Sequence, residues 1–179
     1  MSELIRLATA QDWAAIWPIW RAVVGTGETY TWDPDTDEAT ARRIWTGPPG
    51  AVYVVERPEP DGVPRVVERP DPDGVPRVVA TARLAPNQPG LGAHVANAAF
   101  MVAPESAGAG IGRRLAEHVL EQARLRGYVA MQFNAVVETN AAAVALWRSL
   151  GFTIIGTVPG AFRHPTAGPV GLHVMHRAL

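Results

Sequence analysis

The segment VAPESAGAGIGRRL, residues 102–115, constrains the fold more than any other part of the chain. An apolar run ends at Val102, three glycines follow at alternating positions (Gly108, Gly110 and Gly112), and an amphipathic pattern begins at Ile111. Glycine lets a backbone approach a ligand closely and adopt φ values that other residues avoid. The unpaired N–H groups at a helix N-terminus favour an anion. The segment therefore predicts a strand, a phosphate-binding loop and a helix.

Exclusion narrows the kind of phosphate ligand. A nucleoside triphosphate loop of the Walker type needs a lysine, and all 16 basic residues of this chain are arginine. The dinucleotide pattern G-x-G-x-x-G needs a third glycine one residue later than Gly112, and an acidic residue at the end of the next strand that this sequence lacks. The sequence therefore favours neither nucleotide hydrolysis nor dinucleotide binding.

Two motifs are similar to those of one enzyme family. Residues 102–112 match the pattern V-x-P-x-x-[QR]-G-x-G-[IV]-G everywhere except at Ala107, which stands in place of Gln or Arg. Residues 138–152, ETNAAAVALWRSLGF, resemble N-x-x-A-x-x-L-Y-x-x-x-G-F, with Trp147 where the family often has a tyrosine that protonates the leaving thiolate. Over nearly its whole length, the chain resembles the GNAT superfamily of N-acetyltransferases.

This resemblance implies acetyl-CoA as the acyl donor, without a metal ion. It places the donor against the glycine loop, the end of the preceding strand and the start of the later helix. The predicted cofactor-binding residues are Phe100, Met101, Val102, Ala107, Gly108, Ala109, Gly110, Ile111, Gly112, Arg113 and Asn140. Asn140 then contacts the pantetheine arm. Backbone N–H groups around 100–102 would polarise the thioester carbonyl and hold the developing oxyanion.

Asn97 and Asn134 interrupt two otherwise apolar runs, residues 93–102 and 128–137. Two apolar strands flanking a helix predict a parallel pair buried on both faces. In the family these strands splay apart at the acyl end, so the resemblance gives both amides a catalytic role in positioning the acceptor or a water. The stretch QFNAVVETN also resembles fungal acetyltransferases that act on proline analogues. The alternative is that each asparagine satisfies a neighbouring backbone group.

Acetyl transfer needs an uncharged acceptor amine, whose unperturbed pKa is about 10. Strand 93–102 has no carboxylate to accept the proton, so Glu28, Glu138, His173 and an ordered water remain open as candidates. For Glu138 an ordinary helix-start role is favoured. The predicted substrate-contacting residues are Glu28, Tyr30 and His173. A metal site is not expected, because the chain has no cysteine, and His173 and His176 would point to opposite faces of a strand.

The order of predicted elements indicates one N-acetyltransferase domain, residues 1–179, of the α/β class. We expect a GNAT-like mixed, twisted sheet of six to seven strands with helices on both faces. Pro18 should kink or split the first helix. Residues 159–169 should form a loop between strands 153–158 and 170–175.

A nearly identical repeat, VVERPEPDGVPR followed by VVERPDPDGVPR, forms a duplicated hairpin segment at residues 54–77. Two short copies are too few for a solenoid, which needs about three units. We therefore expect the second copy to extend the loop between strands 51–55 and 78–84. Because closing a loop of twice the length costs only about 0.6 kcal/mol more, such an insertion is tolerable.

The charge and hydropathy of the chain limit the binding partners that can be expected. The net charge of −1 argues against nucleic acid or an anionic membrane as a partner. No signal peptide or membrane-spanning run is evident, so we expect a cytoplasmic protein. The predicted function is acetyl transfer from acetyl-CoA to a small-molecule amine, an amino acid or an analogue. A protein or polyamine acceptor, a non-catalytic CoA-sensing module and a homodimer remain open alternatives.

Overall fold

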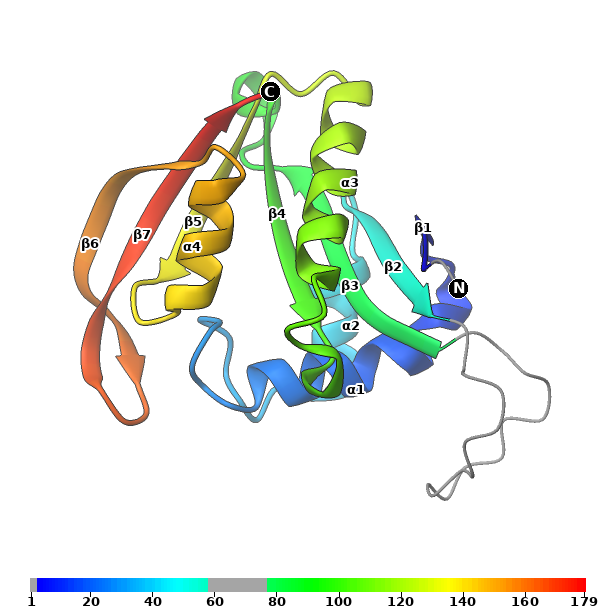
Figure 1. The fold of residues 1–179 in the computed structure, drawn as a ribbon, viewed down its shortest axis with the longest axis horizontal. Coiled ribbons are helices and arrows are strands. Elements are labelled where there is room, and N and C mark those ends of the chain that lie inside the picture. The colour runs from blue at the N-terminus through cyan, green and yellow to red at the C-terminus, as the bar shows by residue number, and fades with distance from the viewer. Residues whose placement is uncertain (1–2, 58–76) are drawn as a thin grey trace.

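The computed structural model describes residues 3–57 and 77–179. Within these ranges seven strands form one mixed sheet, in the order β1-β2-β3-β4-β5-β7-β6 (Figure 1). The strands are β1 (Leu4–Leu7), β2 (Ala51–Arg57), β3 (Arg77–Pro86), β4 (Val95–Val102), β5 (Ala130–Val137), β6 (Thr153–His164) and β7 (Gly168–Ala178). The α-helices are α1 (Trp13–Val24), α2 (Glu38–Thr46), α3 (Ile111–Leu125) and α4 (Ala141–Ser149). The predicted mixed α/β sheet is confirmed.

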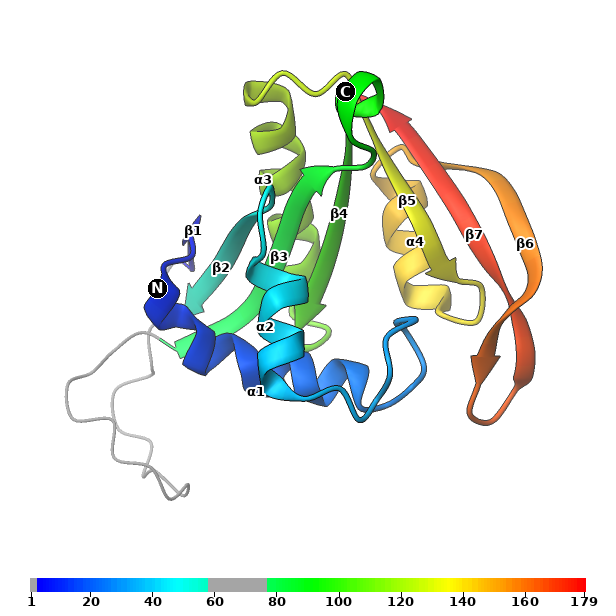
Figure 2. The same ribbon diagram turned by 180° about the vertical axis from the view of Figure 1, so that it is seen from behind.

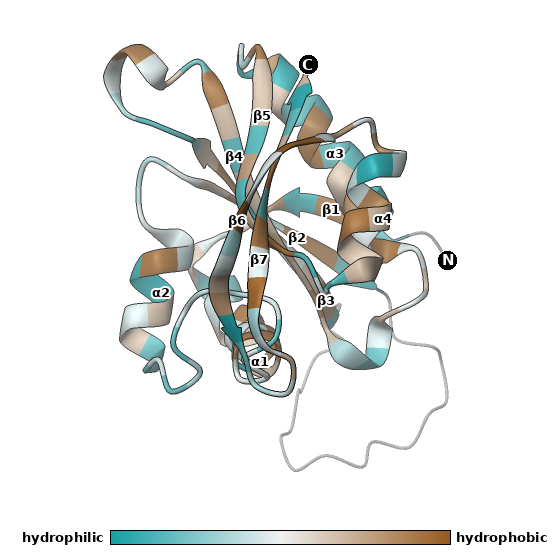
Figure 3. Ribbon diagram, turned by 90° about the vertical axis from the view of Figure 1, so that its left-hand side faces the viewer, coloured by the Kyte–Doolittle hydropathy of each residue, from teal (hydrophilic) through white to brown (hydrophobic). Residues whose placement is uncertain are grey.

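Helices cover both faces of the sheet, as expected. α3 and α4 lie on one face (Figure 1), and α1 and α2 lie on the other (Figure 2). Leu115 of α3 packs with Ala96 and Met131 in the first core, whereas Trp20 of α1 packs with Met101 in the second. Hydrophobic and hydrophilic residues alternate along α3 (Figure 3) because a helix buries one stripe of its surface.

The central feature of the sheet is the separation of β4 from β5. The two strands are parallel and are joined through α3, but their pairing consists of only Val95 with Ala130 and Ala96 with Met131. Beyond Ala96 the strands diverge, which Figure 1 shows as a widening space between them. The inner edge of β4 is therefore free of a β5 partner from this point on.

Two local features differ from the expected ones. α1 is not split at Pro18 and continues through it as one helix. Pro18 and Ala14, whose carbonyl loses its helical partner, are both exposed, so water can satisfy the carbonyl. The expected loop at 159–169 is mostly hairpin, because a register shift between Val158 and Phe162 absorbs the irregular residues before pairing with β7 resumes.

β2 and β3 form the expected antiparallel pair, from Ala51 with Leu84 to Arg57 with Arg77. Most of the duplicated segment, residues 58–76, lies outside the described residues. In the part of the chain that the structure describes, no helix is both long and apolar enough to cross a membrane.

Candidate functional site

The glycine loop presents a series of unpaired N–H groups at the start of α3. Gly108 and Gly110 adopt positive φ values of 79° and 74°, and Gly110 is the residue before the first helical turn. The first helical bond runs from the Arg114 N–H to the Gly110 carbonyl. Within the described ranges, the N–H groups of residues 108–113 donate to no backbone carbonyl. Together with the helix dipole, they give this loop an arrangement of donors that suits an anion.

Two arginines link this loop and the start of α3 to neighbouring segments. The Arg114 guanidinium donates to the Ala109 carbonyl (3.2 Å) and to the Glu3 carboxylate (2.6 and 2.9 Å), which links the loop to the N-terminal segment. Arg113, a predicted cofactor-binding residue, instead donates to the Ser149 hydroxyl at 2.6 Å. Arg114 therefore links the loop to the N-terminal segment and Arg113 links α3 to α4, while the N–H groups of the loop stay available.

Only every second residue of β4 points its backbone N–H and C=O toward the free edge. The N–H of Ala103 donates to the Val79 carbonyl of β3, so the backbone groups of the odd-numbered residues of β4 point toward β3. The backbone groups of Phe100 and Val102 therefore point the other way, into the space beside β5. Of the three predicted backbone donors, Met101 is thus directed toward β3, and its side chain is buried in the second core. This corrects the prediction for Met101, because strand alternation decides which N–H groups are available.

Tyr30 occupies this edge from the loop between α1 and α2. Its hydroxyl donates to the Phe100 carbonyl (2.7 Å) and accepts from the Phe100 N–H (3.1 Å). The ring stacks on Trp32, with centroids 4.8 Å apart, and Trp32 stacks on Trp20 of α1. Burial raises the pKa of Tyr30 above its ordinary value, so the hydroxyl stays protonated. Tyr30 takes the place of the missing β5 strand at Phe100.

The two predicted asparagines lie on the α1–α2 side of the opening between β4 and β5. Asn97 Nδ2 donates to the Gln132 backbone carbonyl of β5 at 3.0 Å. Asn97 Nδ2 (3.3 Å) and Asn134 Nδ2 (2.7 Å) also donate to the same oxygen, Asn87 Oδ1. The structure therefore brings the asparagines together through a third amide, Asn87, which follows the end of β3.

On the other side of the opening, Asn140 and Trp147 belong to the start and the body of α4. Asn140 Oδ1 accepts from the Ala143 N–H at 3.1 Å, so this side chain caps the helix while its Nδ2 stays available. Trp147 is buried against Phe100, Phe133 and Phe152. The ring that stands in place of the family tyrosine is a part of the core.

The candidate proton acceptors are not gathered at the asparagines. His173 is hydrogen-bonded through Nδ1 to the Thr157 hydroxyl (2.8 Å) and lies on the same face of β7 as Met175, a residue of the first core. The Glu138 carboxylate lies over Gly171, where an added Cβ would be 2.1 Å from it. Glu28 is exposed in the α1–α2 loop, two residues before Tyr30.

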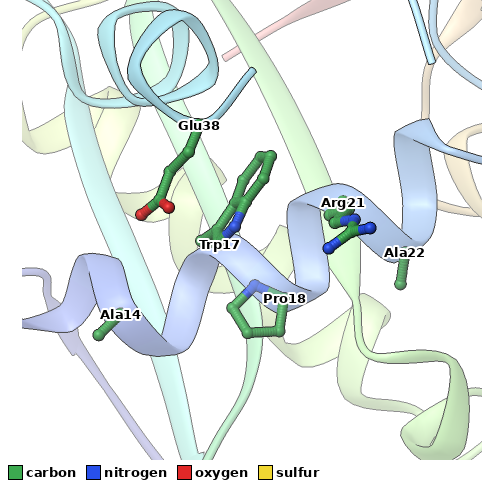
Figure 4. Close-up of a pocket in the computed structure, with 6 residues that line it drawn as sticks. All are labelled: Ala14, Trp17, Pro18, Arg21, Ala22 and Glu38. Atoms are coloured by element: carbon green, nitrogen blue, oxygen red, sulfur yellow. The ribbon is translucent and has the colours of Figure 1, made fainter. Parts of the chain in front are cut away.

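Two surface grooves lie away from these groups. A groove of about 650 Å³ follows the outer side of α1, between Trp17, Pro18, Arg21 and Glu38 (Figure 4). Another, of about 500 Å³, runs along α3 and contains Arg113. In the described ranges, no cluster of histidines and carboxylates could hold a metal ion.

Asn87, Gln132 and Arg114 are residues that the sequence reasoning missed. In the sequence, Asn87 lies in an ordinary loop, Gln132 in a strand and Arg114 on the polar surface of a helix. The role of each comes from contacts with residues distant in sequence, so the local pattern did not indicate it. One signal was available for Gln132, since this polar residue lies two positions before Asn134 in the same apolar run. Asn87 had no such signal.

Comparison with known proteins identifies the family. The model of the acetyltransferase (GNAT) family matches residues 51–152, more than half of the chain. The N-acetyltransferase aca1 of Schizosaccharomyces pombe is 39% identical over 80 residues, which cover 45% of this chain and 38% of that protein. The aligned part of this chain thus spans less than two-fifths of that relative.

Solved structures share the fold over the whole chain. A GCN5-related N-acetyltransferase from Kribbella flavida is 46% identical, with a TM-score of 0.85, and the match covers 99% of this chain and 98% of that one. A phosphinothricin acetyltransferase from Sinorhizobium meliloti, solved in complex with acetyl-CoA, has a TM-score of 0.79 at 21% identity, covering 100% and 89%. The second match supports the fold alone.

Proposed function

Because the chain belongs to the acetyltransferase (GNAT) family, we propose that it transfers the acetyl group of acetyl-CoA to the amine of a small molecule, an amino acid or an analogue. The observation that carries this proposal is the continuity of donor groups from the glycine loop to β4. The loop offers a run of unpaired N–H groups, and the free edge of β4 ends beside it, at Val102. A chain of phosphates continued by an amide-containing arm matches this arrangement.

Each part of the donor has a matching group in the protein. The pyrophosphate is assigned to the N–H groups of residues 108–113, and the pantetheine arm to the edge of β4 and to Asn140 Nδ2. The thioester carbonyl is assigned to the N–H groups of Phe100 and Val102. Donors fixed in a strand stabilise a developing oxyanion because they need no reorganisation during the reaction.

In the reaction, the nitrogen of the neutral amine attacks the thioester carbonyl carbon and forms a C–N bond. The C–S bond then breaks, and the thiolate takes up a proton. Asn97 and Asn134 lie where the strands open and are assigned to the acceptor amine and to a water that carries its proton away. This water is favoured over Glu138, whose carboxylate lies over Gly171 of β7, and over His173, whose Nδ1 is hydrogen-bonded to the Thr157 hydroxyl.

The charge of the acceptor side supports a small amine. Among the described residues, the hydrogen-bond partners of Asn97 and Asn134 are amides and a backbone carbonyl, without a carboxylate. A polyamine would gain most from acidic groups, which attract several positive charges. A neutral polar lining fits an amino acid, which carries both a positive and a negative group.

The test measures free thiol after acetyl-CoA is mixed with single amines. The panel contains amino acids, cyclic secondary amino acids such as proline analogues, polyamines and a peptide with a free N-terminus. We expect release with an amino acid or an analogue. Thiol release with only the polyamine, or only the peptide, would show that the proposed acceptor class is wrong and that the acceptor is that amine instead. Binding of acetyl-CoA without thiol release from any amine would favour a CoA sensor.

A further inference from the structure

Four side-chain amides, from β4, β5 and the residue that follows β3, form one hydrogen-bonded chain across the opening between β4 and β5. Asn97 and Asn134 share the oxygen of Asn87, as described above, and Gln132 Nε2 donates to Asn134 Oδ1 at 2.9 Å. All four side chains project from the side of the sheet that carries α1 and α2. Asn134 is exposed and the other three are half-buried, so an acceptor arriving from solvent can reach them.

One backbone group sets the direction of every bond in this chain. The Gln132 carbonyl only accepts, so the atom of Asn97 that faces it is Nδ2. The other hydrogen of Nδ2 needs an acceptor, which makes the facing atom of Asn87 its oxygen. That oxygen in turn requires Nδ2 from Asn134, whose own oxygen then accepts from Gln132 Nε2. The amides cannot flip one at a time without losing bonds.

This fixed direction decides what the opening offers to a ligand. Both hydrogens of Asn97 Nδ2 are used, while Asn97 Oδ1 has no hydrogen-bond partner in residues 3–57 and 77–179. A free amide oxygen accepts from an amine N–H and leaves the nitrogen lone pair available for attack on the thioester. An uncharged acceptor amine is the species this oxygen suits.

We propose that Asn87 is a positioning residue, whose oxygen holds Asn97 and Asn134 so that Asn97 Oδ1 faces the acceptor amine. This inference rests on the proposed function, since it assigns a role to Asn87 within that site. Asn87 itself acts through its two neighbours. Its contribution is therefore to acceptor binding and orientation, and the acetyl-CoA loop is independent of it.

The experiment compares the same substitution at two positions. Asn87→Asp retains an oxygen facing both Nδ2 groups, so the acceptor KM should stay within about threefold of the wild-type value. Asn97→Asp places an oxygen against the Gln132 carbonyl, so kcat/KM should fall by at least about tenfold. Asn87→Ala removes the shared oxygen and should raise the acceptor KM about tenfold. The acceptor in each assay is the amine of the panel with the highest wild-type rate.

Controls separate positioning from folding. Gln88→Ala removes an exposed amide at the next position and should change neither KM nor kcat. In all variants the acetyl-CoA affinity should stay near the wild-type value, and each variant is assayed well below its own melting temperature, because the lost hydrogen bonds lower stability. An unchanged acceptor KM in Asn87→Ala, or equal damage from Asn87→Asp and Asn87→Ala, would overturn this inference alone. A wild-type protein without amine-dependent thiol release would overturn the proposed function and this inference with it.

Discussion

Replacing Tyr30 by phenylalanine should destabilise the free protein and strengthen its binding of acetyl-CoA. The Tyr30 hydroxyl makes two hydrogen bonds to Phe100, one to the carbonyl and one from the N–H. The Phe100 N–H is also one of the donors assigned to the thioester carbonyl. Because one N–H cannot serve both partners well, bound acetyl-CoA should displace the Tyr30 oxygen from it.

The size of each effect follows from these two bonds. A neutral hydrogen bond contributes about 1 kcal/mol to stability, so losing both should lower the free energy of unfolding by about 2 kcal/mol. On binding, the wild-type protein gives up only the bond from the Phe100 N–H. The variant has no such bond to give up, and about 1 kcal/mol corresponds to roughly fivefold tighter binding.

Calorimetric titration with acetyl-CoA and with CoA tests this reasoning. CoA lacks the thioester carbonyl, so its affinity should be the same in Tyr30→Phe and in the wild type. Tyr128→Phe is the matched control, since in the described ranges the Tyr128 hydroxyl has no hydrogen-bond partner. Weaker or unchanged acetyl-CoA binding in Tyr30→Phe, or an equal gain for CoA, would refute the competition at Phe100.

Three further predictions concern the glycine loop, an ion pair and the repeat. Gly112→Ala should keep or raise the melting temperature, because the added Cβ would meet its neighbours at 3.6 Å or more. The same Cβ narrows the space between β4 and α4, so the acetyl-CoA affinity measured by calorimetry should fall at least tenfold. An unchanged affinity would contradict this prediction. The hydrogen bonds from Arg6 lower the pKa of Asp12 to about 2, below its unfolded value, so the pair stabilises the fold above about pH 4 and is lost as the pH falls toward 2. Asp12→Asn should therefore cost about 2 kcal/mol in urea unfolding at pH 7 and little at pH 2, and an equal loss at both pH values would count against the pair. Deleting residues 66–77 puts Arg65 in place of the equivalent arginine at the start of β3, and because twelve residues is an even number, the faces of the strand are kept. The shortened protein should fold and keep its thiol-release rate, whereas precipitation would show that the second copy makes necessary contacts.

The sequence alone predicted the parts of this protein that depend on local pattern. The glycines at 108, 110 and 112 specify a loop before α3 because backbone freedom and helix amphipathicity are properties of a short segment. The same holds for the apolar strands β4 and β5, since an apolar run is also a property of a short segment. The family motifs coincide with these segments, so the fold could be predicted from them and the donor site proposed from the same residues.

The contacts among the polar groups proposed for the acceptor were decided only by the tertiary structure. The Tyr30 hydroxyl meets Phe100 across 70 positions of sequence, and Asn87 meets Asn134 across 47. Such contacts depend on strand register and on the face to which each side chain points, and neither can be read from the residues themselves. For the same reason Met101 was expected at the thioester although its N–H faces β3. Local pattern selects the elements, and the divergence of β4 from β5 determines which polar groups meet between them.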